Sequence, residues 1–281
     1  MASNSRTGTS PDYSKALESF DLDAARSLFS GSFRDGINAC VECCDAHLPD
    51  NAVALDWIAV DGHHETRNFL ELRDEAARVA NLLAEQGIQP GDIVAGLLPR
   101  TPDLVAVVLG ALRAGAAYQP LFTAFGPKAI EDRLTMSGAK LVVTDVANRE
   151  KLDGVKGCPP VALIADTPDE LVAGDIDFRR AMTAQSAEFS PVLRNGDDLM
   201  LMMATSGTTG PAKGVPVPLK ALPAFRSYMV EGIDLRPEDV FGTLPIRAGP
   251  MGSTMQSSVH CCWGMQPLWS KGHSRWTALM T

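Results

Sequence analysis

The sequence predicts an α/β protein in which a parallel sheet is flanked by helices and followed by the start of a second sheet. Apolar runs of strand length alternate with helical segments from residue 53 to residue 145, and this alternation is typical of a parallel sheet with crossover helices. A further apolar run at 199–204 breaks into a loop of glycine and hydroxyl residues, the place where open α/β sheets bind their ligands. The 281 residues, 45% hydrophobic and 21% charged, have an ordinary globular composition.

The N-terminal elements follow from hydrophobic spacing and turn residues. In chain order we expect a flexible tail over 1–14, helices over 15–30 and 35–47, strands over 53–60 and 65–69, and a helix over 72–83. Asp61-Gly62 separates the two strands, and such a pair between apolar runs indicates a hairpin. Gly87 and the turn at Pro90-Gly91-Asp92 end the last of these helices.

The central elements alternate between strand and helix. In chain order we expect a strand over 93–98, a helix over 104–114, a short strand over 116–121, a helix over 128–137, strands over 139–145 and 158–166, an irregular acidic connection over 167–197, and a buried strand over 199–204. Thr101 is the expected N-cap of the first helix here, because Pro102 suits the first helical position.

Charge and composition favour small-molecule partners. The net charge is -9 and the pI is near 5.0, which argues against a nucleic-acid or anionic membrane surface. The first ten residues lack the apolar core of a signal peptide, and no run approaches the roughly 20 apolar residues of a membrane span. We therefore expect a cytoplasmic protein with no nucleic-acid or membrane partner, and the sequence leaves the oligomeric state open.

Cys40, Cys43, Cys44 and His47 fall at i, i+3, i+4 and i+7. On a helix they share one face, so this cluster raises the alternative of a zinc-binding module. The competing interpretation is an ordinary helix packed on the sheet, because cysteine is among the most buried residue types. We favour the packed helix and expect no metal there.

The loop after the 199–204 strand has the composition of a phosphate site. Glycines let the backbone approach an anion, hydroxyl groups donate hydrogen bonds, and a lysine supplies a mobile positive charge. The candidate binding residues are Thr205, Ser206, Gly207, Thr208, Thr209, Gly210, Lys213 and Gly214. The Walker P-loop is excluded, since it needs glycine before the lysine and Ser or Thr after it, whereas Ala212 and Gly214 flank Lys213. A bland linker is the remaining alternative.

The segment Thr-Ser-Gly-Thr-Thr-Gly-Pro-Ala-Lys-Gly at 205–214 resembles the phosphate loop of the AMP-forming acyl-CoA synthetases. This adenylating superfamily also contains luciferases and peptide-synthetase adenylation domains, and Val215-Pro-Val-Pro-Leu219 resembles its acetyl-CoA-synthetase-like members. The resemblance covers roughly 35–241 and implies an incomplete N-terminal domain of the adenylating-enzyme fold, with a first subdomain over 15–197 and the start of a second over 198–241.

The resemblance implies that ATP activates a small carboxylic acid as an acyl-adenylate, which then passes to coenzyme A. ATP, Mg²⁺ and coenzyme A are the implied cofactor and co-substrates. The loop would bind the β and γ phosphates, and Lys213 would be the catalytic cation that offsets charge as pyrophosphate leaves. The alternative for Lys213 is a solvated surface lysine.

Residues 242–281 have neither helical nor alternating period and do not resemble the family. After Pro-Glu-Asp-Val-Phe, here 237–241, family members commonly continue Trp-Asn-Leu-Ala-Asp-Pro-Gly-Trp-Ala-Tyr-Gly. Codons can be chosen for that segment such that loss of one base yields all eleven residues of Gly242–Gly252. We therefore predict that 242–281 is an out-of-frame tail; the alternative is a genuine, divergent C-terminus.

Two functional expectations follow from that tail. The adenine-contacting, magnesium-binding and ribose-binding segments of the family lie beyond 241, so we expect this chain alone to have negligible adenylation activity, because the reaction depends on positioning two reactants. The alternative function is a non-catalytic nucleotide-binding or interaction protein that keeps the loop.

Overall fold

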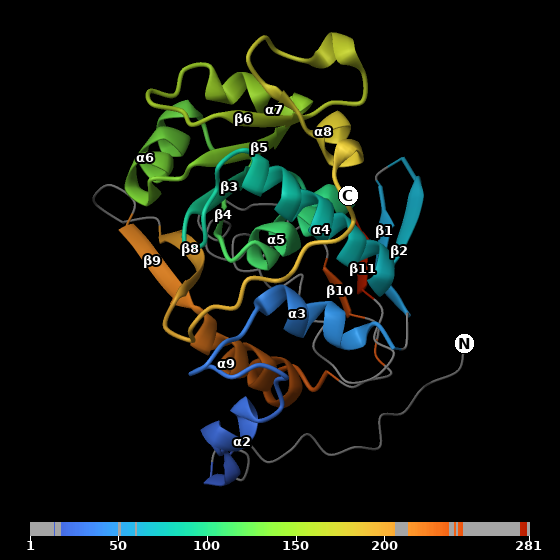
Figure 1. The fold of residues 1–281 in the computed structure, drawn as a ribbon, viewed down its shortest axis with the longest axis vertical. Coiled ribbons are helices and arrows are strands. Elements are labelled where there is room, and N and C mark those ends of the chain that lie inside the picture. Colours follow the sequence, from blue (N-terminus) through green and yellow to red (C-terminus); the bar gives the residue numbers. More distant parts are fainter. Residues whose placement is uncertain are drawn as a thin grey trace.

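Two sheets organise the chain (Figure 1). The computed structural model describes residues 14, 18–49, 52–59, 61–205, 213–235, 239, 241–243 and 276–279. Within this part, a seven-stranded sheet has the order β7-β6-β5-β3-β4-β8-β9, and a four-stranded sheet has the order β10-β11-β1-β2.

The strands and helices have the following bounds. The strands are β1 Val53–Ile58, β2 His64–Asn68, β3 Ile93–Leu97, β4 Ala117–Pro120, β5 Leu141–Asp145, β6 Val161–Ile164, β7 Ile176–Asp177, β8 Leu199–Thr205, β9 Lys213–Pro218, β10 Phe241–Thr243 and β11 Trp276–Leu279. The helices are α2 Leu22–Arg26, α3 Ala39–Cys43, α4 Phe69–Glu85, α5 Pro102–Arg113, α6 Pro127–Ser137, α7 Val146–Arg149, α8 Phe178–Ala184 and α9 Leu222–Ser227. Short helical turns are η1 Asp45–His47, η2 Glu150–Leu152, η3 Pro168–Glu170, η4 Leu219–Ala221 and η5 Tyr228–Gly232.

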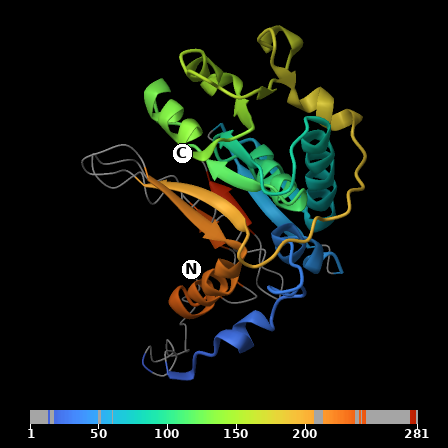
Figure 2. The ribbon, with the colours of Figure 1, turned by 60° about the vertical axis from the view of Figure 1, so that its left-hand side comes forward.

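The large sheet is parallel from β7 through β8 and ends in the antiparallel pair β8–β9. Alternate residues of its strands enter different cores: Val94 packs with α4 and α5, whereas its neighbour Ala95 packs with α6. Figure 2 shows α4 and α6 on opposite sides of the sheet. The predicted α/β class with helices on both faces is therefore confirmed.

Several predicted elements are present, with different ends. Asp61 and Gly62 do join β1 and β2 as an antiparallel hairpin. Thr101 is the N-cap of α5 and Pro102 begins the helix, but the Thr101 side chain makes no capping hydrogen bond. The predicted helix over 15–30 is wrong, because it is interrupted: residues 18 and 19 are helical, Phe20 and Asp21 are not, and α2 spans Leu22–Arg26 after the N-cap Asp21. The connection 167–197 is less irregular than expected, since it contains β7 and α8.

The strand that precedes the candidate loop lies in a different place from the one predicted. We expected 199–204 to begin a second sheet, but β8 extends the first sheet beside β4, with Leu201 opposite Tyr118. The physical reason is that β4 would otherwise leave an apolar edge open, and an apolar strand closes it. The second sheet instead combines β1 and β2 with β10 and β11.

Asn38 joins three distant segments. Its Oδ1 accepts hydrogen bonds from the backbone N–H groups of Cys40 and Val41, at 2.9 and 3.2 Å, and so caps α3. Its Nδ2 donates to the carbonyl oxygens of Leu112 and Val192, each at 2.8 Å. Because Asn38 is only 2% exposed, these bonds satisfy an amide that would otherwise be costly to bury.

None of the helices within the described ranges has both the length and the apolar character needed to cross a membrane.

Candidate functional site

The candidate loop connects the two strands of the β8–β9 hairpin. β8 runs parallel to β4 and ends at Thr205, so the loop leaves the sheet at the carboxyl end of a parallel strand. β9 returns antiparallel from Lys213, which pairs directly with Thr205. The Thr205 hydroxyl donates to the carbonyl oxygen of Lys213 at 3.4 Å. The two ends of the loop are thereby held together.

The structure describes three of the predicted site residues. Thr205 is half-buried, and Lys213 and Gly214 are exposed at the start of β9. Within the described part of the chain, the Lys213 ammonium group has no ion-pair partner. The other predicted residues, Ser206, Gly207, Thr208, Thr209 and Gly210, lie outside the described residues. The geometry therefore places the catalytic candidate Lys213 at the base of the loop with its charge open to a ligand.

Gly214 packs closely against two methionine side chains that the sequence did not point to. A Cβ at this position would be 3.1 Å from Met136 Sδ of α6 and 3.3 Å from Met202 Sδ of β8. The absence of a side chain at Gly214 thus lets β9 approach α6, which supports the hairpin from one face. No sequence pattern pointed to the contact between Met136 and Gly214, because the two residues are far apart in the chain.

The cysteine cluster is part of the core. Cys40, Cys43 and Cys44 are all buried, and His47 stacks on Phe69 with 4.9 Å between ring centroids. Burial, followed by the nearby Asp45 carboxylate, raises the pKa of Cys40 to about 12. Burial and the neighbouring Cys40 also raise the pKa of Cys44 well above its ordinary value. The three cysteines pack in the main hydrophobic core, as the packed-helix interpretation predicts.

A cation site is not assembled in the described ranges, where no group of three or more His, Cys, Asp and Glu side chains could hold a metal ion. The donor set at the hairpin is a hydroxyl, an ammonium group and exposed backbone, which suits the phosphates of a nucleotide rather than a metal. The chemistry of these groups therefore fits ATP.

The fold and the site together define a class: an α/β protein with a sheet covered on both faces and a Gly/Ser/Thr-rich loop at the carboxyl end of a strand. A family model described as AMP-binding enzyme matches residues 45–266. The chain belongs to the AMP-binding enzyme family. The match includes 242–266, which we predicted to be out of frame, and that assignment stays a prediction.

Individual relatives agree with this family. Over 242 residues the chain is 31% identical to the acetyl-coenzyme A synthetase of Streptomyces avermitilis, covering 78% of this chain and 37% of that protein. The crystal structure of an acyl-CoA synthetase from Brucella canis superposes with a TM-score of 0.86 and 50% identity, covering 95% of this chain and 47% of that one. Apo MatB from Rhodopseudomonas palustris, at 24% identity and a TM-score of 0.66 over 86% of this chain and 45% of that chain, shares the fold.

The chain spans less than half the length of each of these relatives. The confirmed likeness to acyl-CoA synthetases thus concerns their N-terminal part. The subdomain boundaries predicted at 197 and 241 stay predictions.

Proposed function

We propose that this chain is the phosphate-loop-bearing part of an AMP-forming acid–thiol ligase. Such an enzyme joins a carboxylic acid to the α-phosphate of ATP, releases pyrophosphate, and then transfers the acyl group from AMP to the thiol of coenzyme A. The observation that carries the proposal is the β8–β9 hairpin, which closes a Gly/Ser/Thr-rich loop between Thr205 and Lys213. Membership of the AMP-binding enzyme family supports it.

Each described residue has a distinct task in this proposal. Lys213 contacts the β and γ phosphates and offsets the negative charge that develops on departing pyrophosphate. Thr205 closes the loop and offers its hydroxyl at the same end of β8. Gly214 keeps β9 close to α6, so the loop is carried by a supported hairpin. Ser206, Gly207, Thr208, Thr209 and Gly210 complete the phosphate contacts through backbone N–H and hydroxyl groups. Mg²⁺ would accompany the phosphates and neutralise part of their charge.

We further propose that the acid is small, acetate or a short- to medium-chain acid. The support is the likeness of this chain to relatives named acetyl-coenzyme A synthetase and acyl-CoA synthetase. A cytoplasmic location is part of the same proposal, as is the absence of a nucleic-acid partner, which rests on the charge of -9.

Nucleotide binding tests the site directly. We expect the chain to bind ATP with a Kd that Lys213→Ala raises by about tenfold or more, because a hydrogen bond to a charged group is lost. Lys140→Ala is the matched control. Lys140 is an exposed lysine at the amino end of β5, whereas the loop follows the carboxyl end of β8. Equal ATP affinity of the two variants, measured by titration calorimetry, would contradict the assigned role of Lys213.

Catalysis is a separate question from binding. For the 281-residue chain alone, negligible carboxylate-dependent exchange between ATP and pyrophosphate stays our prediction. Robust exchange by this chain would overturn it and would show that the residues needed for adenylation are present.

A further inference from the structure

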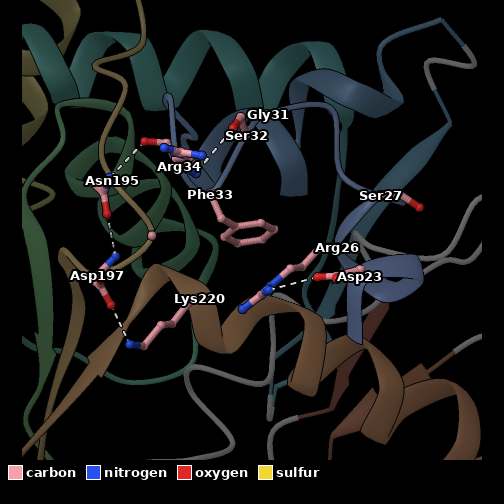
Figure 3. Close-up of a pocket in the computed structure, with 11 residues that line it drawn as sticks. Asp23, Arg26, Ser27, Gly31, Ser32, Phe33, Arg34, Asn195, Asp197 and Lys220 are labelled. Atoms are coloured by element: carbon pink, nitrogen blue, oxygen red, sulfur yellow. Dashed lines mark hydrogen bonds and ion pairs between the residues drawn. The ribbon is translucent and has the colours of Figure 1, made fainter. Parts of the chain in front are cut away.

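A polar pocket of 610 Å³ lies apart from the candidate loop, at the other end of the β8–β9 hairpin. Its lining includes Arg26, Phe33, Arg34, Asn195, Asp197 and Lys220. These residues come from α2, from the turn before α3, from the turn before β8 and from η4. Figure 3 shows the ring of Phe33 between Arg34 on one side and Arg26 and Lys220 on the other. The volume falls within the roughly 300–1,000 Å³ of small-molecule sites.

Backbone hydrogen bonds hold the pocket walls in place. Gly196 N donates to the Phe33 carbonyl at 2.7 Å, and Lys220 N donates to the Gly196 carbonyl at 2.7 Å. Asn195 Nδ2 donates to the Arg34 carbonyl at 2.9 Å. Gly196 allows this approach, because a Cβ there would be 2.7 Å from the Phe33 carbonyl oxygen. The walls are therefore preformed by segments far apart in sequence, which lowers the entropic cost of binding.

A buried carboxylate fixes the turn that carries Phe33 and Arg34. Glu42, only 7% exposed, accepts hydrogen bonds from Ser30 N at 2.9 Å, Ser30 Oγ at 2.7 Å and Gly31 N at 2.8 Å. Its negative charge is used entirely within the turn and does not face the pocket. The other acid of the turn, Asp35, accepts a hydrogen bond from Ser32 Oγ at 2.8 Å. Neither carboxylate forms an ion pair with Arg34.

The pocket carries positive charge that the protein leaves available. Among described residues, the exposed Arg34 guanidinium has neither a hydrogen bond nor an ion pair. Arg26 does contact Asp23 through Nη1 at 3.0 Å, and Lys220 contacts Asp197. Three cations face two carboxylates, in a chain whose net charge is -9. The lining thus has an excess of one positive charge, carried by the unpaired Arg34. An exposed, unpaired guanidinium at a pocket favours an anionic ligand.

We propose that this pocket binds a small phosphorylated molecule with a planar ring, of the size of a nucleoside monophosphate. The planar guanidinium groups of Arg26 and Arg34 match phosphate oxygens in pairs of hydrogen bonds. The half-buried ring of Phe33, held edge-on by Phe29 with 5.4 Å between centroids, offers its face to a planar group. Asn195 and Ser32 are neutral polar residues of the lining.

This site is independent of the proposed phosphate loop. Asp197 precedes β8 and Lys220 follows β9, so the pocket lies at the base of the hairpin and the loop at its tip. β9 extends over six residues from Lys213 to Pro218. An extended strand rises about 3.3 Å per residue, so the two ends of β9 are well separated. A ligand in the pocket and a nucleotide at the loop therefore occupy different ends of β9, and each can be removed by its own substitutions.

Binding of uridine monophosphate and of inorganic phosphate to the full chain tests the proposal. By titration calorimetry we expect uridine monophosphate to bind, and Arg26→Gln and Arg34→Gln each to raise its Kd by about tenfold. Arg34→Lys keeps the charge without the planar fork and is expected to give an intermediate affinity. Phe33→Leu is expected to weaken uridine monophosphate but to leave inorganic phosphate unchanged, because only the former has a ring to stack.

Two controls separate this site from general charge and from the loop. Arg180→Gln removes the same charge from an exposed position on α8, and Lys213→Gln removes a cation from the loop; neither is expected to change the Kd. All of these arginine variants are expected to unfold at the wild-type temperature. Absence of binding at millimolar concentrations, an equal effect of Arg180→Gln, or loss of binding in Lys213→Gln alone would overturn the proposal.

Discussion

Gly110 of α5 lies so close to Val79 of α4 that a Cβ at Gly110 would be 2.4 Å from Val79 Cβ. Alanine normally favours a helix over glycine by roughly 0.5–1 kcal/mol. Here steric overlap opposes that preference, and overpacking a core costs about 1–3 kcal/mol. We therefore expect Gly110→Ala to lower the free energy of unfolding, measured by urea denaturation.

The same contact predicts a specific rescue. Val79→Ala alone leaves a cavity and destabilises the protein. In the double variant it removes Val79 Cγ1, which a Cβ at Gly110 would meet at 2.4 Å, and the remaining contact with residue 79 Cβ can relax into the vacated space. We expect the two substitutions together to cost less than the sum of their separate costs, with a coupling of about 0.5–3 kcal/mol. Simple additivity in a double-mutant cycle would contradict a direct contact between the two helices.

Gly214 gives a second steric prediction, at the loop. Gly214→Val brings side-chain atoms against Met136 and Met202, whose sulfur atoms lie 3.1 and 3.3 Å from a Cβ built there. We expect weaker ATP binding, because the larger side chain pushes β9 away from α6 and so displaces Lys213, the first residue of β9. Met136→Ala in the same chain is expected to restore much of the affinity. If Met136→Ala does not improve the Gly214→Val variant, α6 does not support the hairpin.

The buried thiol of Cys40 predicts a loss of stability in alkali. Its pKa is about 12 in the folded protein against an ordinary value of 9.0, so between these values the unfolded chain releases a proton that the folded chain retains. The free energy of unfolding therefore falls as pH rises from about 9 to about 12, by up to about 1.4 kcal/mol per pH unit. Below pH 9 both states keep the proton, and the thiol adds no pH dependence.

Comparison with Cys40→Ala isolates this thiol. At neutral pH, the difference in unfolding free energy between wild type and variant measures the packing lost with the thiol. The change of this difference with pH measures the effect of ionising the Cys40 thiol. We expect the difference to shrink, or to reverse sign, as pH rises above the ordinary thiol pKa of 9.0. A difference that stays constant from neutral pH to the alkaline limit of the measurement would contradict a protonated, buried Cys40.

The coding DNA after Phe241 tests the predicted change of reading frame. We expect that restoring one base there gives a sequence resembling Trp-Asn-Leu-Ala-Asp-Pro-Gly-Trp, continued by an open frame. If all three frames downstream of that codon lack such a continuation, residues 242–281 are a genuine part of the protein. The family match through residue 266 makes this measurement informative in either direction.

The parallel strands were predictable because both of their faces are buried. Ile93–Leu97 and Leu141–Asp145 are largely apolar runs with nearly all residues buried, as expected for strands covered on both sides. Leu199–Thr205 is also largely apolar, although only Met200 and Leu201 in it are buried. β9 was missed because Pro216 and Pro218 oppose a strand assignment in its sequence. Proline is nevertheless tolerated at a sheet edge, where its missing N–H leaves no ladder bond unmade. Edge position is a property of the assembled sheet, so no local pattern predicts it.

The loop and the pocket also differ in how far a local sequence pattern can predict them. The loop at Thr205–Gly214 could be proposed from sequence because all of its polar groups lie in one contiguous segment. Arg26, Arg34 and Lys220 share a pocket only through backbone hydrogen bonds between the 31–36 and 194–196 segments, which sequence spacing does not encode. Sequence reasoning can thus propose a site whose residues are neighbours in the chain, but it does not point to a pocket whose residues are neighbours only in space.

The Asn38 amide has a consequence for the growing chain on the ribosome. Its acceptors Leu112 and Val192 are added 74 and 154 residues later. At roughly 5–20 residues per second, the residues of α3 are synthesised several seconds or more before Val192, the last acceptor of the Asn38 amide. Nascent chains stalled before residue 192 are therefore expected to keep the Asn38 amide solvated and α3 accessible to protease, and chains stalled well beyond it to protect both.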